Sequence, residues 1–223
     1  MSQDNTERWI RAYEDREALW LHDGNPKRPH ALLSKGEHSS GFFNSELVIE
    51  DAVLLDAATR ALMRLLRNVC PIITVVDRVV GPAMGAITLA HDLARQIGKE
   101  RVRPCLSSYV EKEGEGEDLI MVFKRRSVRP GENVLLGEDV LSTGGSVDLS
   151  ARAVEKARGV VMPVVGALVN RSGLTELNGR KIVALIDRPM PKWAAHECPL
   201  CKQGSEAIRP KEKGNWARLN AKY

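Results

Sequence analysis

Two adjacent acids, Glu138 and Asp139, are separated by two residues from a run of hydroxyl and glycine residues at positions 142–146. They follow a short apolar run, residues 134–136, within the segment VLLGEDVLSTGGSV. This pattern is typical of a buried strand that turns into a helix, and the N–H groups at a helix start carry partial positive charge and bind phosphate. Two glycines in the turn permit a positive φ and a close approach of the backbone to a ligand. The segment therefore predicts an anion site with two carboxylates at its edge.

The two carboxylates indicate that the ligand is not all phosphate. Charged acceptors make strong hydrogen bonds to a vicinal diol. A ribose 5-phosphate would place its 2- and 3-hydroxyls on Glu138 and Asp139 and its phosphate on residues 142–146. The segment is not a Walker P-loop, because no lysine follows its glycines, and it lacks the G-x-G-x-x-G pattern of a dinucleotide-binding turn. The alternative is a capped strand-to-helix turn whose acids are merely solvated.

Apolar runs that alternate with helical patterns predict the elements that position this turn. The predicted strands are 73–81, 101–110, 132–140, 160–169 and 181–186, and the helices between them are 82–98, ending on Gly98, and 144–159, ending on Gly159. Such alternation implies a parallel sheet covered on both faces, and open parallel sheets bind ligands beyond the carboxyl ends of their strands. We therefore expect an α/β fold with an open, mostly parallel sheet flanked by helices.

The rest of the chain lies outside this alternation. Periodicity predicts a helix over 6–21, then short strands within 31–49, and an amphipathic helix over 51–69 that Asp51 caps. Residues 111–132 combine a charged, glycine-rich stretch, a hairpin arm and a basic cluster, which is typical of a functional or disordered loop. From about Pro189 onward the chain predicts an extended tail, packed on the domain or partly loose.

The composition excludes several classes of protein. The 223 residues are 43% hydrophobic and 28% charged, which is close to the average of globular domains. No apolar run approaches the ~20 residues that span a bilayer, and the N-terminus lacks the apolar core of a signal peptide. Four cysteines are too few for a disulfide scaffold, so we expect a cytoplasmic protein with reduced thiols. The net charge of +4 favours anionic ligands but does not by itself argue for nucleic acid. Because no recognisable RNA-binding module accompanies the basic tail, a nucleic-acid partner is unlikely.

The segment 134–147 resembles the signature of the type I phosphoribosyltransferases, enzymes that use phosphoribosyl diphosphate (PRPP). Within that family the chain is similar to the orotate-using branch over roughly residues 30–205. The segments that carry the similarity are LLSKGEHSSGFFN, VVGPAMGAITLAHDLARQIG, SSYVEK, ALVNRSG and CPLCKQG. The resemblance implies the type I fold with a small hood, divided into an N-terminal helix and hood (1–50), a core (51–188) with a mobile loop at 111–126, and a C-terminal tail (189–223).

The resemblance also implies roles for individual residues. PRPP would be bound by the amides of Ala83, Met84 and Gly85 and by Glu138, Asp139, Val140, Leu141, Ser142, Thr143, Gly144, Gly145 and Ser146. Lys112, which opens the catalytic loop, would act in catalysis with Glu138 and Asp139. Phe43 and Arg171 would lie at the pyrimidine, although Phe43 could belong to a small core and Arg171 could pair with an acid. Lys124 and Arg125 would supply further charge from the loop.

The reaction implied by the resemblance is the transfer of ribose 5-phosphate from PRPP to orotate, giving orotidine 5-monophosphate and diphosphate in pyrimidine biosynthesis. Mg²⁺ would be the cofactor, bound through PRPP and water rather than through protein side chains. A homodimer is the expected assembly.

The chain departs from the pattern at Ser34, where many relatives carry a substrate-contacting lysine, and has Lys35 one place along. Two alternatives therefore stay open: a phosphoribosyltransferase for another nucleobase, or a non-catalytic regulator that senses PRPP. His196, Cys198 and Cys201 have the proximity of metal ligands, but a structural zinc usually takes four. Because no second Cys or His pair follows in the tail, a turn with two buried thiols is the preferred interpretation.

Overall fold

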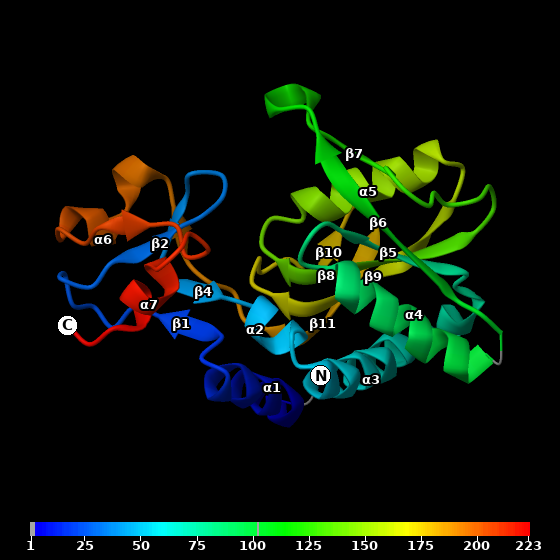
Figure 1. The fold of residues 1–223 in the computed structure, drawn as a ribbon, viewed down its shortest axis with the longest axis horizontal. Helices are drawn as coiled ribbons and strands as arrows, with labels where there is room; N and C mark the ends of the chain where they lie inside the picture. Colours follow the sequence, from blue (N-terminus) through cyan, green and yellow to red (C-terminus); the bar gives the residue numbers. More distant parts are fainter. Residues whose placement is uncertain (1–2, 102) are drawn as a thin grey trace.

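The computed structural model describes residues 3–101 and 103–223, and its centre is a seven-stranded sheet (Figure 1). The five inner strands run parallel, in the order β11 (Arg180–Asp187), β9 (Val160–Asn170), β8 (Asn133–Leu141), β5 (Arg78–Pro82) and β6 (Leu106–Glu113). The short strands β10 (Glu176–Leu177) and β7 (Ile120–Val122) pair antiparallel at the two edges. The expected open, mostly parallel α/β sheet is therefore confirmed.

Helices cover both faces of this sheet (Figure 1). One face packs against α1 (Gln3–Asp15), α3 (Ala52–Val69) and α4 (Ile87–Arg101), and the other packs against α5 (Gly145–Lys156). Successive strand residues alternate between the two cores, so Leu135 faces the first and Leu136 faces the second. This alternation follows from the two-residue period of a strand and explains why the inner strands read as continuous apolar runs.

The N-terminal hood and the C-terminal tail form a second, smaller sheet together. Its order is β12 (Lys192–Trp193), β3 (His38–Ser39), β2 (His30–Leu32) and β13 (Ala207–Ile208). Beside it, β1 (Leu19–Leu21) pairs with β4 (Gly41–Phe43), and the indole N–H of Trp20 donates to Leu219 O in α7 (Asn215–Asn220) at 2.8 Å. The tail is thus paired with the hood strand by strand, as the adjacent blue and red segments of Figure 1 show. Short elements complete the chain: α2 (Glu46–Ile49), α6 (Pro199–Lys202), and the 3₁₀ turns η1 (Pro71–Val75), η2 (Gly116–Asp118) and η3 (Ala195–Glu197).

The predicted boundaries of two elements in the N-terminal half, the first helix (6–21) and the strand 73–81, were wrong. The first helix stops at Asp15, because Glu17 takes a positive φ of 51° and the chain reverses into β1. The apolar side chains at 19–21 therefore belong to a strand. The run 73–81 is divided between η1 and β5, since the chain makes a 3₁₀ turn before it enters the sheet.

The predicted helix ends also need correction, whereas the predicted cap is confirmed. Helix α4 continues past Gly98 to Arg101. A Cβ atom on Gly98 would lie 3.3 Å from Cys105 N, so this glycine permits a close approach of the next loop rather than a helix stop. Helix α5 ends at Lys156. Asp51 caps α3 and accepts hydrogen bonds from the N–H groups of Val53 and Leu54. No helix of the described residues combines the length and apolar character that crossing a membrane requires.

Candidate active site

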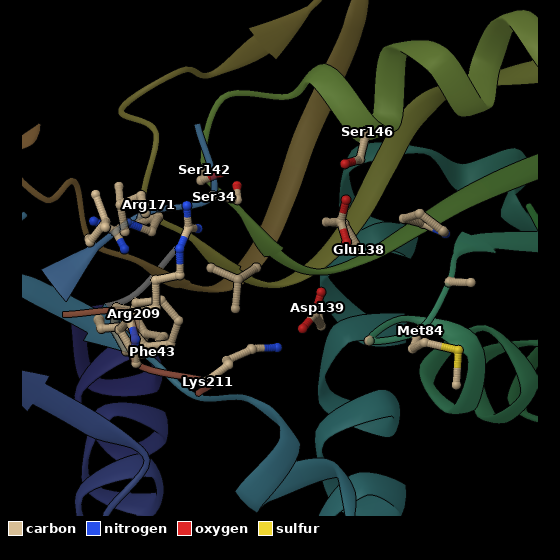
Figure 2. A pocket seen from close by; sticks show the side chains of 18 of the residues that line it. Ser34, Phe43, Met84, Glu138, Asp139, Ser142, Ser146, Arg171, Arg209 and Lys211 are labelled. Carbon is tan, nitrogen blue, oxygen red and sulfur yellow. The ribbon is translucent and has the colours of Figure 1, made fainter. Parts of the chain in front are cut away.

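The paired acids lie at the carboxyl end of β8, where the chain turns into α5 (Figure 2). Gly144 forms the helix N-cap with a φ of 79°, and a Cβ there would lie 2.8 Å from Leu177. The N–H groups of Ser142, Thr143 and Gly144 have no hydrogen-bond acceptor within the described part of the chain. Unpaired amides at a helix start are donors for an anion, so the turn has the chemistry of a phosphate site.

A cavity of about 460 Å³ opens in front of this turn. Most of the predicted site residues line it: Phe43, Ala83, Met84, Gly85, Lys112, Glu138, Asp139, Val140, Ser142, Ser146 and Arg171. Thr143, Gly144 and Gly145 form the turn at its edge, and Leu141 is buried in the core against α5. The cavity therefore brings together residues from the hood, from β5, β6 and β8, from the residue that follows β9, and from the tail.

Glu138 is buried beside Asp139 at the floor of the cavity. Burial raises the pKa of the Glu138 carboxyl well above its usual value, and the negative charge of Asp139 raises it further. The positive charge of Lys112 opposes this shift in the pKa. A carboxyl group in these surroundings gains from a ligand that donates hydrogen bonds, as the hydroxyls of a sugar do.

The turn after β5 was predicted to offer three amides to a diphosphate, and this prediction needs one correction. The N–H of Ala83 donates to Val110 O on the neighbouring strand β6 at 2.8 Å, so it is already used within the sheet. Within the described residues, the N–H groups of Met84 and Gly85 have no such acceptor. Met84 and Gly85 therefore keep free amides at the cavity, and Ala83 does not.

Arg171 follows β9 and brings a buried positive charge to the other end of the cavity. Its side chain is 5% exposed, and its guanidinium donates to Ser39 Oγ in the hood at 2.7 Å. Burial lowers the pKa of Arg171 to about 10, while the negative charge of Glu37 opposes that shift. No carboxylate of the described residues forms an ion pair with Arg171. The alternative that Arg171 pairs with a nearby acid is therefore not what the structure contains.

The hood contributes aromatic and polar side chains to the same end. Phe43 is buried and packs edge-on against Tyr13 with ring centroids 5.4 Å apart, while Phe42 packs against Trp216. Ser34 lines the cavity. Lys35 extends toward the phosphate turn, where its Nζ lies 3.5 Å from the position of a Cβ on Gly145. Lys35 thus brings its positive charge to the start of the helix and not to the position of Ser34.

The C-terminal tail also lines the cavity, which the sequence did not predict. The tail residues Arg209, Pro210, Lys211 and Glu212 line it, within the stretch that the sequence predicted only as an extended tail. Lys211 pairs with Glu46 at 2.7 Å. The basic residues were the only feature of the sequence that could have indicated a role for this stretch at an anion site. Pairing of β13 with β2 brings the stretch to the cavity.

The predicted mobile loop forms a hairpin of β6 and β7 around η2. Lys112 lies on β6 opposite Met121 and lines the cavity. Lys124 instead pairs with Glu111 at 3.8 Å, and both Lys124 and Arg125 are exposed outside the cavity. The structure therefore brings one of the three predicted loop cations to the site.

This arrangement of sheet, acids and phosphate turn defines a phosphoribosyltransferase, and the chain belongs to that family. Residues 50–186 match the phosphoribosyl transferase domain. The curated relatives that the chain matches include orotate phosphoribosyltransferases. One from Caldicellulosiruptor saccharolyticus is 32% identical over 207 residues, which cover 92% of this chain and 96% of the relative. One from Thermus thermophilus is 35% identical over 186 residues, covering 83% and 94%.

Solved structures agree on the fold. The crystal structure of orotate phosphoribosyltransferase from Aeropyrum pernix matches with a TM-score of 0.59 over 79% of this chain and 91% of that chain, at 20% identity. The resemblance and the fold expected from the sequence are confirmed.

Proposed function

We propose that the chain transfers ribose 5-phosphate from PRPP to orotate, with Mg²⁺, giving orotidine 5-monophosphate and diphosphate in pyrimidine biosynthesis. The observation that carries the choice of base is Arg171, a buried cation that lines the cavity without a carboxylate partner in the described residues. A buried charge is costly unless it is paired. The carboxylate of orotate would supply that pair.

The cavity suggests how the two substrates lie. The 5-phosphate would sit on the amides of 142–146, and the ribose hydroxyls would bind Glu138 and Asp139. The diphosphate would lie between the Met84 and Gly85 amides and Lys112. The base would then stack within the hood near Phe43, with its carboxylate directed at Arg171.

The chemistry follows from charge. The bond from ribose C1 to the diphosphate oxygen breaks with its electron pair on diphosphate, and a ring nitrogen of orotate forms the new bond on the opposite face. That nitrogen loses its proton as the bond forms, and the leaving diphosphate, on which negative charge has grown, would take the proton up. Lys112 would offset the charge that grows on the leaving diphosphate. Glu138 and Asp139 would hold the ribose while C1 becomes electron-poor. Closure of the hairpin 111–126 would exclude the water that competes with the base.

The donor chemistry of the cavity suits Mg²⁺, because carboxylates provide the hard oxygen atoms that this ion prefers. Diphosphate oxygens and water would hold the ion mainly, with Glu138 and Asp139 beside it. Bound there, it would neutralise charge on the diphosphate.

The proposal includes a homodimer in the cytoplasm. Apolar side chains that are 80% exposed, at Met84 next to the cavity and at Val53, support a covered surface there. Reduced cysteines suit the cytoplasm, and the four cysteines are unpaired. Light scattering coupled to size-exclusion chromatography measures the molar mass of the protein in solution. The mass of two chains is expected, and the mass of one chain would contradict the proposed homodimer.

The test of the function compares orotate with uracil, which lacks the carboxylate. Diphosphate release is followed with PRPP, Mg²⁺ and a panel of bases. The native chain should use orotate, and Arg171→Gln should raise the KM for orotate by roughly 10- to 100-fold, the worth of a charged hydrogen bond of about 1.5–3 kcal/mol. Arg188→Gln is the matched control, because Arg188 follows the next strand and lies outside the cavity.

Other outcomes decide between the remaining functions. Release of diphosphate only with a purine or with another pyrimidine would show that the enzyme uses that base in place of orotate. No release with any base, while PRPP binds, would select the non-catalytic regulator. An Arg171→Gln variant that still prefers orotate over uracil as strongly as the native chain would contradict the assigned role of Arg171.

A further inference from the structure

Four metal-ligating side chains converge where the hood meets the tail. They are His30 at the start of β2, His38 at the start of β3, and Cys198 and Cys201 around α6. One ligand atom from each lies within 4.8 Å of the other three. His30, His38 and Cys198 are buried, and Cys201 is at the surface. Figure 1 shows the elements that carry them, β2 and α6, on the same side of the molecule.

The distances resemble the edges of a zinc tetrahedron. Bonds of about 2.3 Å to sulfur and about 2.0–2.1 Å to nitrogen put neighbouring ligand atoms roughly 3.3–3.8 Å apart. Cys201 Sγ lies 3.3 Å from His38 Nδ1 and 3.6 Å from His30 Nε2, and Cys198 Sγ lies 3.5 Å from His30 Nε2. The two ring nitrogens are 2.9 Å apart, and this edge would widen by roughly 0.4 Å around the ion.

The hydrogen bonds of His30 leave its Nε2 ready to bind a metal. Ser205 Oγ donates to Arg28 O at 2.6 Å, so this hydroxyl accepts from the Nδ1–H of His30 at 2.8 Å. The Nε2 atom then carries a lone pair and no hydrogen. Three polar atoms surround that nitrogen within 3.6 Å, but one lone pair accepts one hydrogen bond. A cation at the centre satisfies all four atoms together, and Ser205 orients the ring as partners of zinc-binding histidines do.

We propose that His30, His38, Cys198 and Cys201 bind one structural Zn²⁺ that joins the hood to the tail. Two thiolates and two imidazoles in tetrahedral geometry select zinc among common ions. Four protein ligands leave no open position, so the ion is not catalytic.

The position of the ion gives it a role in shaping the cavity. Strand β2 leads into Leu32–Ser34, and β13, which pairs with β2, leads into Arg209–Glu212; both stretches line the cavity. The ion would therefore fix two cavity walls relative to each other. The interpretation from sequence considered His196 as the third ligand, but its side chain is 82% exposed and faces Glu197.

The experiment measures metal on the full, reduced chain and needs no activity, so its result is independent of the proposed function. Purified protein is reconstituted with Zn²⁺, freed of excess ion and analysed by mass spectrometry of metals. About one zinc per chain is expected. Cys201→Ser should lose it, while Cys105→Ser, a free cysteine outside the cluster, and His196→Ala should keep it.

Two further measurements test the zinc site without relying on Cys201→Ser. Co²⁺ added to the metal-free native chain should give the visible and thiolate charge-transfer absorption of a tetrahedral site with sulfur ligands. Ser205→Ala, which keeps all four ligands, should weaken zinc binding by roughly 10- to 100-fold. The proposal is overturned if the native chain retains no more zinc than Cys201→Ser, or if the cobalt spectrum lacks thiolate bands.

Discussion

Gly85 and Asp139 lie so close that a Cβ atom on Gly85 would be 2.6 Å from Asp139 Oδ2. Real Cβ atoms do not approach an oxygen this closely. The Asp139 carboxylate therefore occupies its observed position beside the turn after β5 only because position 85 has no side chain. This contact joins the expected diphosphate end of the cavity to its ribose end.

Gly85→Ala should displace the Asp139 carboxylate and lower kcat/KM by on the order of 100-fold, because misplacement of about 1 Å costs that much. The free energy of unfolding should change little, because the atoms that a Cβ would meet lie at the far end of the Asp139 side chain and can move aside. Gly137→Ala on β8 is the control, since a Cβ there would meet its nearest neighbour at an ordinary 3.6 Å. If Gly85→Ala and Gly137→Ala lowered turnover equally, the contact between Gly85 and Asp139 would have no specific role in catalysis.

Glu138→Gln should stabilise the unliganded protein at neutral pH. The pKa of Glu138 is raised in the native state by burial, so the native state holds its proton to a higher pH than the unfolded chain does. Native stability is therefore lost as the pH rises above the usual glutamate pKa of 4.5 and up to the native pKa. Glutamine carries no charge and avoids this loss.

The gain in Tm of Glu138→Gln should thus grow as the pH rises above 4.5 and vanish as the pH falls below it. Thermal unfolding across this range measures it, with the exposed Glu115→Gln as a control that should show no such trend. A gain in Tm that does not depend on pH would contradict the explanation.

The same substitution should weaken catalysis, because an amide replaces a carboxylate as the acceptor for ribose hydroxyls. We expect kcat/KM to fall by roughly 10- to 100-fold, the equivalent of about 1.5–3 kcal/mol for a charged hydrogen bond. Steady-state kinetics at saturating base, with PRPP varied, gives the value. An unchanged kcat/KM would place the sugar elsewhere.

Lys112→Ala should reduce turnover by at least about 100-fold while PRPP still binds, because the lost charge acts mainly on the diphosphate as it leaves. Lys124→Ala should change turnover less than about threefold, since a surface ion pair contributes little and Lys124 contacts Glu111 outside the cavity. Single-turnover rates and PRPP binding by calorimetry separate the two steps. Normal turnover of Lys112→Ala would exclude Lys112 from the mechanism.

Lys35→Ala should raise the KM for PRPP by roughly 10-fold, in line with the loss of a charged contact of about 1.5 kcal/mol. Its ammonium group lies beside the start of α5, so it would bind the 5-phosphate equally before and during the reaction and leave kcat unchanged. Lys27→Ala, an exposed hood lysine, is the control. A fall in kcat with an unchanged KM would place Lys35 at the reacting centre instead.

The sequence by itself determined the strand, turn and helix around Glu138 and Asp139, because the fourteen residues of that segment need only local geometry to bring acids and amides together. It also determined α3 and its cap at Asp51, for the same reason. It did not determine that residues 19–21 form a strand or that α4 runs through Gly98. Propensity at those positions yields to the reversal of the chain at Glu17 and to the close approach of Cys105.

The tertiary structure alone decided the sites that join distant parts of the chain. Arg171 meets Ser39 across 132 residues, and His30 meets Cys198 across 168. No periodicity or spacing encodes such contacts, since they depend on which strands pair and which faces are buried together. The hood and tail sheet brings the two histidines to the cysteines and the basic tail to the cavity. Its pairing is set by the summed packing of the whole chain.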